Sequence, residues 1–245
     1  MGAKANCHAI DIKLSQLHRP MITRLLLAFA VLAAQSSNAV AESDFQQWVG
    51  VALRINLTDT LSIQSDSQLR ASNDRAGLVQ VQNVVLLAYK ASPDVTIAGG
   101  YLHGSNYDGG KFLNLERRAR EQVSVDNIAR IGPAVLGARV RTEQRWRDDL
   151  GGTAWRIRPY ARVSIPLGDK SAPTLQVSEE LFINLNTTAF QSVEGVERLR
   201  SAIVLSTPLA RNVRLDAGYL NQHRFVRGGE DRGDHVMTAS LALSF

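Results

Sequence analysis

The feature that most constrains this chain is an alternation of apolar and polar side chains that recurs from Gln46 to Phe245. The alternation runs in segments of about ten to fifteen residues, each expected to form a β-strand with one apolar and one polar face. The clearest segment spans 139–147. There Val140, Thr142, Gln144 and Trp146 alternate with Arg139, Arg141, Glu143, Arg145 and Arg147. The sequence therefore predicts an all-β protein.

The breaks between the segments alternate in length. Short breaks are found at 58–59, 91–94, 166–173 and 207–212. Longer breaks, polar or rich in glycine, are found at 72–77, 104–111, 148–152, 186–195 and 227–233. Short turns on one rim and longer loops on the other are typical of an antiparallel up-and-down transmembrane β-barrel. About eleven segments can be counted, but single-chain bacterial barrels have an even strand number, so we expect about 10–12 strands and favour twelve.

A soluble β-sandwich or lipocalin-like barrel in the periplasm is the alternative fold. It would place the apolar faces inward and the charges in water. The predicted strands are longer than the roughly five to six residues usual in soluble sheets, which favours the membrane barrel.

The N-terminal part predicts export. Arg24 precedes an apolar run, 25–34, which leads to the small residues Ala39-Val40-Ala41. This is the plan of a secretory signal peptide with cleavage after Ala41, and the apolar run is too short to span a bilayer as a helix. We expect residues 1–41 to be an N-terminal extension and a cleaved signal peptide, with translation starting at Met1 or Met21. Residues 42–245 then form the barrel, located in the bacterial outer membrane.

The C-terminus predicts two partners for the barrel. The last segment sets Met237, Leu241, Leu243 and Phe245 on one face. A terminal aromatic residue preceded by apolar residues at every second position is the usual tag for the barrel-assembly machinery. We therefore expect contacts with that machinery and with outer-membrane lipid.

If the apolar faces meet lipid, the polar faces enclose a lumen rich in arginine. The charge network expected there comprises Arg118, Arg120, Arg139, Arg141, Glu143, Arg145, Arg156, Arg158 and Glu180. Buried charges are tolerated when they are paired, and the arginine fork can bridge two carboxylates. The network is consistent with a salt-bridged plug that fills the barrel and fixes its register, or with a narrow porin-like channel for a small anionic solute.

Other binding chemistries find no support in the sequence. The five histidines show no metal-ligand spacing, so we expect neither a metal nor a cofactor. The arginines alternate along strands instead of forming an aromatic-interleaved patch, so we expect no nucleic-acid binding.

Several short pieces, in this order, resemble an uncharacterised family of bacterial outer-membrane barrels catalogued as a domain of unknown function. They are Trp48, Gln68-Leu69-Arg70, Gly100-Tyr101, Glu116-Arg117-Arg118, the 139–145 ladder, Glu180-Leu181-Phe182 with Asn184, Gly218-Tyr219 with Asn221-Gln222, and Asp234-His235-Val236. The family more often has Glu-His-Arg where this chain has Glu116-Arg117-Arg118. The resemblance implies a fold and a location but no activity.

A local stretch also resembles outer-membrane phospholipase A. Tyr101, His103, Ser105 and Asn106 follow its Tyr-x-His-x-Ser-Asn pattern, which implies Ser105 as nucleophile and His103 as base. The position of that enzyme's orienting asparagine holds Arg117 here, and Asn114 is the nearest substitute. We expect a barrel without enzymatic activity, and keep a lipid-facing serine esterase using His103, Ser105 and Asn114 as the alternative.

Overall fold

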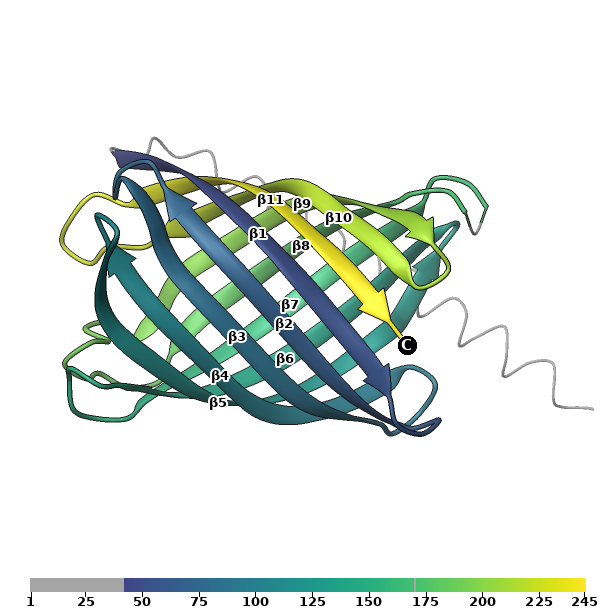
Figure 1. Ribbon diagram of the computed structural model, residues 1–245, viewed down its shortest axis with the longest axis horizontal. Coiled ribbons are helices and arrows are strands. Elements are labelled where there is room, and N and C mark those ends of the chain that lie inside the picture. The colour runs from purple at the N-terminus through teal and green to yellow at the C-terminus, as the bar shows by residue number, and fades with distance from the viewer. Residues whose placement is uncertain (1–41, 170) are drawn as a thin grey trace, which may run out of the picture. The chain divides into compact units, whose positions relative to one another are not determined.

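The computed structural model describes residues 42–169 and 171–245, and within them the chain forms eleven β-strands joined in order (Figure 1). Their bounds are β1 Glu42–Asn56, β2 Leu61–Ser72, β3 Gly77–Lys90, β4 Val95–Asp108, β5 Lys111–Ile131, β6 Ala134–Arg147, β7 Ala154–Pro166, β8 Thr174–Asn184, β9 Gly195–Ala210, β10 Val213–Arg224 and β11 Arg232–Ser244. The expected signal peptide, residues 1–41, lies outside the described residues. Among those described, no helix is long and apolar enough to cross a membrane.

The strands form one closed barrel in which each strand pairs with its neighbours in the chain and β1 closes against β11. Closure is by a parallel pair that runs in register from Glu42 opposite Arg232 to Arg54 opposite Ser244. The expectation of an even strand number, and the preference for twelve, is therefore wrong. An odd number of strands closes when the first and last run in the same direction, so one seam is parallel while every other pair is antiparallel.

The connections divide between two rims of the barrel. The turn rim carries 57–60, 91–94, 132–133, 167–169 with 171–173, and 211–212. The loop rim carries 73–76, 109–110, 148–153, 185–194 and 225–231. The turn at Gly132-Pro133 is absent from the predicted breaks, and the 104–111 break is shorter than predicted because β4 continues to Asp108. Gly109 and Gly110 close that hairpin with φ values of 53° and 75°, as a two-residue turn with both central residues in the left-handed region requires.

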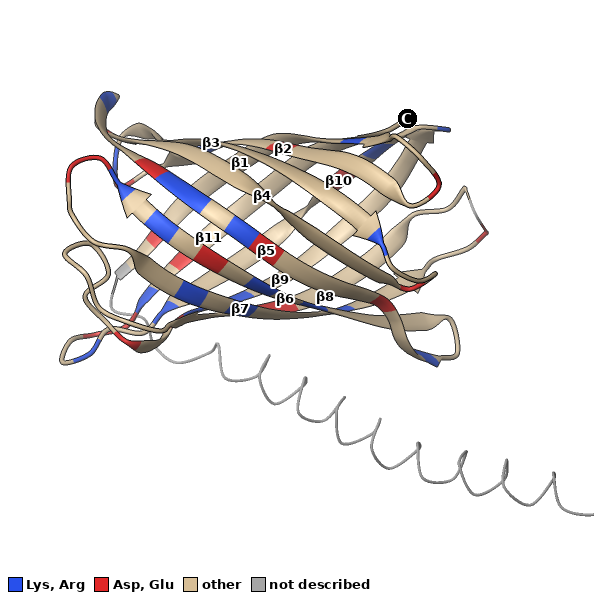
Figure 2. Cartoon of the chain, turned by 90° about the horizontal axis from the view of Figure 1, so that it is seen from below, with Lys and Arg blue, Asp and Glu red and all other residues tan. Residues whose placement is uncertain are grey.

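The side chains divide between the two faces as the alternation predicts. Val85, Leu87 and Ile203 on the outer face are each more than half exposed, whereas Trp48 and Glu143 on the inner face are 4% and 0% exposed. Figure 2 shows charged residues following one another along β5, while β3 and β4 are almost free of charge in the same view. The interior therefore has a charged wall and, on β3 and β4, a small apolar cluster made of Val84, Leu86, Ala88, Ala98 and Leu102.

Candidate functional site

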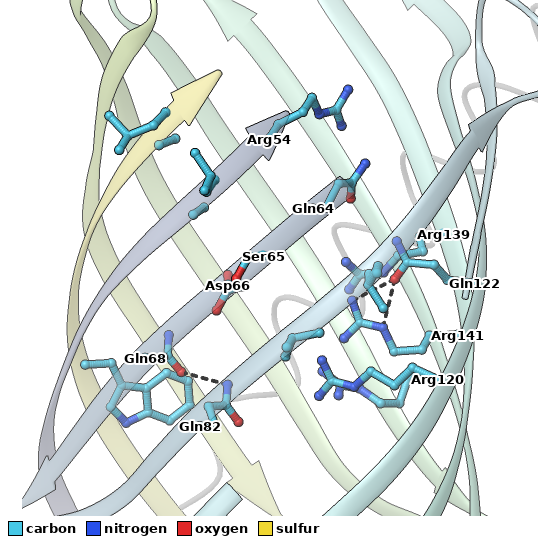
Figure 3. A pocket seen from close by; sticks show the side chains of 18 of the residues that line it. Arg54, Gln64, Ser65, Asp66, Gln68, Gln82, Arg120, Gln122, Arg139 and Arg141 are labelled. Atoms are coloured by element: carbon cyan, nitrogen blue, oxygen red, sulfur yellow. Dashed lines mark hydrogen bonds between the residues drawn. The ribbon is translucent and has the colours of Figure 1, made fainter. Parts of the chain in front are cut away.

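Two cavities occupy the interior of the barrel. The larger, about 1080 Å³, extends to residues of the turn rim such as Arg211 and Asn212, and part of its lining is drawn in Figure 3. The smaller, about 410 Å³, is lined by loop-rim residues such as Asp74 and Arg75. Four residues line both cavities and mark where they meet: Trp48, Arg70, Gln80 and Arg198.

The wall of the larger cavity is strongly cationic. Thirteen arginines line it but only two carboxylates, Asp66 and Glu116. Every arginine of the expected charge network is among them: Arg118, Arg120, Arg139, Arg141, Arg145, Arg156 and Arg158. Alternation within the strands turns these side chains inward, because each lies an even number of residues from the next on its own strand.

Glu143 on β6 is the centre of the ion pairs in this wall. Its carboxylate is fully buried and accepts from Arg156 Nη2 at 2.6 Å and from Arg158 Nη1 at 2.8 Å. Arg120 Nε lies 2.8 Å from the same carboxylate. Register explains the convergence, since Arg120 and Arg156 are the direct partners of Glu143 on the two adjacent strands.

Two further carboxylates extend this network along the wall. Glu116 Oε1 accepts from Arg118 Nε at 2.8 Å and from Arg145 Nε at 2.6 Å. Glu180 accepts from Arg139 Nη2 at 2.6 Å and from Arg158 Nη2 at 2.7 Å. Because Arg158 contacts both Glu143 and Glu180, these strands are joined by a continuous chain of charges. Removing one partner of a buried pair is strongly destabilising, so the network limits which substitutions this part of the wall tolerates.

A second group of arginines is held by glutamines instead. Gln68 Oε1 accepts from Arg70 Nε at 2.7 Å, and Gln222 Oε1 accepts from Arg200 Nε at 2.8 Å. Gln122 Oε1 accepts from Arg141 Nε and Nη2 at 3.0 and 2.9 Å. Within residues 42–169 and 171–245, no carboxylate oxygen lies within ion-pair distance of these three arginines.

Two aromatic rings organise the arginines where the cavities meet. The Arg70 and Arg200 guanidinium carbons lie 3.9 and 4.8 Å from the centroid of the Trp48 ring. Phe182 has the guanidinium of Arg158 at 4.1 Å and that of Arg200 at 4.5 Å. Arginine stacks favourably on aromatic faces, so the rings set the planes of neighbouring cations that would otherwise repel one another.

Sequence reasoning missed several of the arginines and glutamines that line the interior. Arg198 and Arg200 belong to the same two-residue spacing that identified Arg156 and Arg158, and that signal was present in the sequence. The glutamines gave no such signal, since a glutamine on the polar face of a strand looks like any other lumenal residue. Their partners on adjacent strands become visible only through the register.

The structure does not bring together the three residues of the esterase alternative. His103 is exposed on the outer face of β4, and Ser105, two residues on, lies on the same face. Asn114 is buried on the inner face, where its Oδ1 accepts from Asn106 Nδ2 at 2.7 Å. The wall of the barrel therefore separates the expected orienting group from the expected base.

No group of three or more potential metal ligands of the His, Cys, Asp and Glu types occurs among the described residues. At the loop rim, the backbone N–H of Val226 and the ring of His223 donate to Asp231, at 2.9 and 2.8 Å. These contacts, the backbone one foremost, lower the pKa of the Asp231 carboxyl. The acid therefore anchors the 225–231 loop.

Comparison with known proteins identifies the family of this chain. Residues 45–233 match the family model described as "Protein of unknown function (DUF2490)". An uncharacterized protein of Methylorubrum extorquens is 26% identical over 229 residues, covering 91% of this chain and 98% of the relative. The siderophore receptor PirA from Pseudomonas aeruginosa aligns at 14% identity and a TM-score of 0.27, covering 74% of this chain. This chain spans about a third of that receptor's length, 34%. The match over 45–233 covers well over half of the sequence, and the chain belongs to the DUF2490 family.

Proposed function

We propose that this chain is a bacterial outer-membrane β-barrel whose lumen conducts small anions. The observation that carries the proposal is the excess of cations in the wall of the larger cavity. Of its thirteen arginines, five have no carboxylate within ion-pair distance among the described residues: Arg54, Arg70, Arg141, Arg200 and Arg211. A cationic wall in a cavity of low dielectric raises the local concentration of anions and repels cations. The location in the outer membrane is a part of the proposal that must be tested separately.

The outer surface supports the membrane location. Closure leaves no unpaired strand edge, and the strands, from 11 to 21 residues, are long enough to cross a bilayer at a tilt. The exposed side chains include large apolar residues on most strands and aromatic ones near the rims, such as Phe112, Trp146 and Phe245. An apolar band flanked by aromatic residues is the usual exterior of an outer-membrane barrel.

The size of the barrel supports a narrow passage. Barrels of about eight strands are filled by their own side chains, and those of about sixteen enclose an open channel. Eleven strands lie between these limits, and here the paired wall occupies one part of the lumen while two cavities occupy the rest. The proposed path runs through both cavities and past Trp48.

Fractionation and bilayer recording test the two parts of the proposal. We expect the protein in the outer-membrane fraction, extracted only by detergent and with heat-modifiable mobility on gels; recovery as a free periplasmic protein would reject the membrane location. In planar bilayers under a KCl gradient, we expect a small conductance whose reversal potential shows preference for chloride. Absence of conductance, or preference for potassium, would reject the channel.

A further inference from the structure

The interior arginines belong to two classes that differ in what neutralises them. The arginines of the charged wall form ion pairs with Glu116, Glu143 and Glu180. Three other arginines donate hydrogen bonds to glutamine side-chain oxygens instead: Arg70 to Gln68, Arg141 to Gln122 and Arg200 to Gln222. An amide oxygen positions a guanidinium by a hydrogen bond but leaves its positive charge in place.

The glutamine contacts also leave most of the donors of these arginines available. A guanidinium has five N–H groups, and Arg70 and Arg200 each donate through Nε alone. Within the described part of the chain, no protein acceptor meets their four Nη hydrogens. The planar Nη edge is the part of arginine that binds phosphate and carboxylate groups in pairs of hydrogen bonds.

Trp48 brings two of these cations to one place. Arg70 and Arg200 both stack on its ring, and the indole N–H donates to Gln46 Oε1 at 2.9 Å, which fixes the ring. Trp48 and Arg70 line both cavities, and Arg200 lines the larger one. The two stacked arginines therefore lie close to the point where the cavities meet. Two unneutralised charges held this close are unfavourable unless water or an anion compensates them.

We infer that Arg70 and Arg200, stacked on Trp48, form a binding site for a small solute with two or more anionic oxygen groups. Phosphate and carboxylate groups share the chemistry that the site recognises. One anionic group meets each guanidinium, and the larger cavity, with Arg141 in its wall, gives access from the turn rim. The inference deepens the proposed function and rests on it only in requiring that solute reaches the lumen.

Replacing Gln68 by glutamate tests the inference without removing an arginine. Gln68→Glu gives Arg70 a carboxylate partner at the same position, so the barrel is expected to fold and one of the two cations to be neutralised. Gln222 is left unchanged, because its Nε2 donates to Asp234 and a glutamate there would face that carboxylate. Gln64→Glu is the matched control, because Gln64 lines the same cavity and none of its side-chain atoms holds an arginine in the described structure.

Calorimetric titration of the detergent-purified barrel supplies the measurement. Inorganic pyrophosphate and citrate serve as the phosphate and carboxylate probes, and chloride as the monovalent reference. We expect saturable binding of at least one probe, weakened about tenfold or more in Gln68→Glu and much less in Gln64→Glu. The stronger probe identifies the group that the site prefers.

Two results would overturn the inference: no saturable binding of either probe, or equal affinity in the wild type and Gln68→Glu. Bilayer conductance of the same preparations separates this outcome from failure of the channel. Binding without conductance would reject the channel and retain the site. Conductance without binding would reject the site and retain the channel.

Discussion

At the scale of single residues, the lumen shows that arginine has two roles that depend on its acceptor. A carboxylate acceptor makes the arginine part of the wall, and a glutamine acceptor leaves a cation exposed to the cavity. The arginine ladder of β6 and β7 could be predicted from alternation alone, because a charged residue at every second position must face one side. The division into two roles could not, since it depends on cross-strand partners such as Gln122 and Arg141.

Glu143 is expected to be the carboxylate on which the stability of the barrel most depends. Glu143→Gln leaves Arg120, Arg156 and Arg158 without their shared counter-charge, and loss of one partner from a buried ion pair costs about 3–5 kcal/mol. Urea unfolding of the purified barrel should show a loss of this order. Glu230→Gln is the control, since Glu230 is exposed in the 225–231 loop and should change stability by about 0.5 kcal/mol or less. Equal effects of both substitutions would contradict the central role of Glu143.

Asp66 is expected to limit the anion preference of the lumen. It lines the larger cavity opposite the charged wall (Figure 3), and no cation lies within ion-pair distance of it among the described residues. Asp66→Asn removes one of the two lining carboxylates and should shift the reversal potential further toward that of chloride. Asp59→Asn, in a turn outside the cavity, should leave it unchanged. An unchanged reversal potential in Asp66→Asn would show that Asp66 does not face the ion path.

At the scale of the elements, two glycines allow adjacent strands to approach closely. A Cβ on Gly100 of β4 would lie 2.0 Å from the Val85 carbonyl oxygen, and one on Gly218 of β10 would lie 2.2 Å from that of Ile203. Both glycines precede an outward tyrosine, Tyr101 or Tyr219. Glycines at such positions let strands coil sharply enough for a small barrel to close. The sequence shows the Gly-Tyr pairs, but their cause lies in the neighbouring strand.

Gly218→Ala is therefore expected to destabilise the barrel by about 1–3 kcal/mol, because the new methyl group must displace backbone. The measurement is the fraction of protein with heat-modifiable mobility after refolding, which should fall. Gly104→Ala is the matched control on β4, since its Cβ would meet only ordinary contacts, the nearest at 3.4 Å. A normal folded fraction for Gly218→Ala would show that the strands can separate at that point.

At the scale of the whole molecule, the closure of the barrel is what the sequence could not specify. Period-two alternation determines which face of a strand is apolar, but it carries no information about which strand closes the sheet or in which direction. The rule of even strand number supplied that missing step, and it gave the wrong answer. The parallel seam of β1 and β11 places the start of β1 beside the loop rim, opposite the C-terminus at Phe245.

This topology predicts a labelling pattern that an even-stranded barrel cannot give. In a Cys7→Ser background, Ser43→Cys at the start of β1 and Gly229→Cys in the 225–231 loop should react alike with a membrane-impermeant maleimide on intact cells. Asp59→Cys at the turn rim should react only after the outer membrane is permeabilised. An even number of strands would place Ser43 on the rim that holds Phe245, opposite Gly229, because the first strand would then begin where the last one ends. Labelling of Ser43→Cys and Gly229→Cys from opposite sides of the membrane would therefore reject the parallel seam, whichever rim faces the medium.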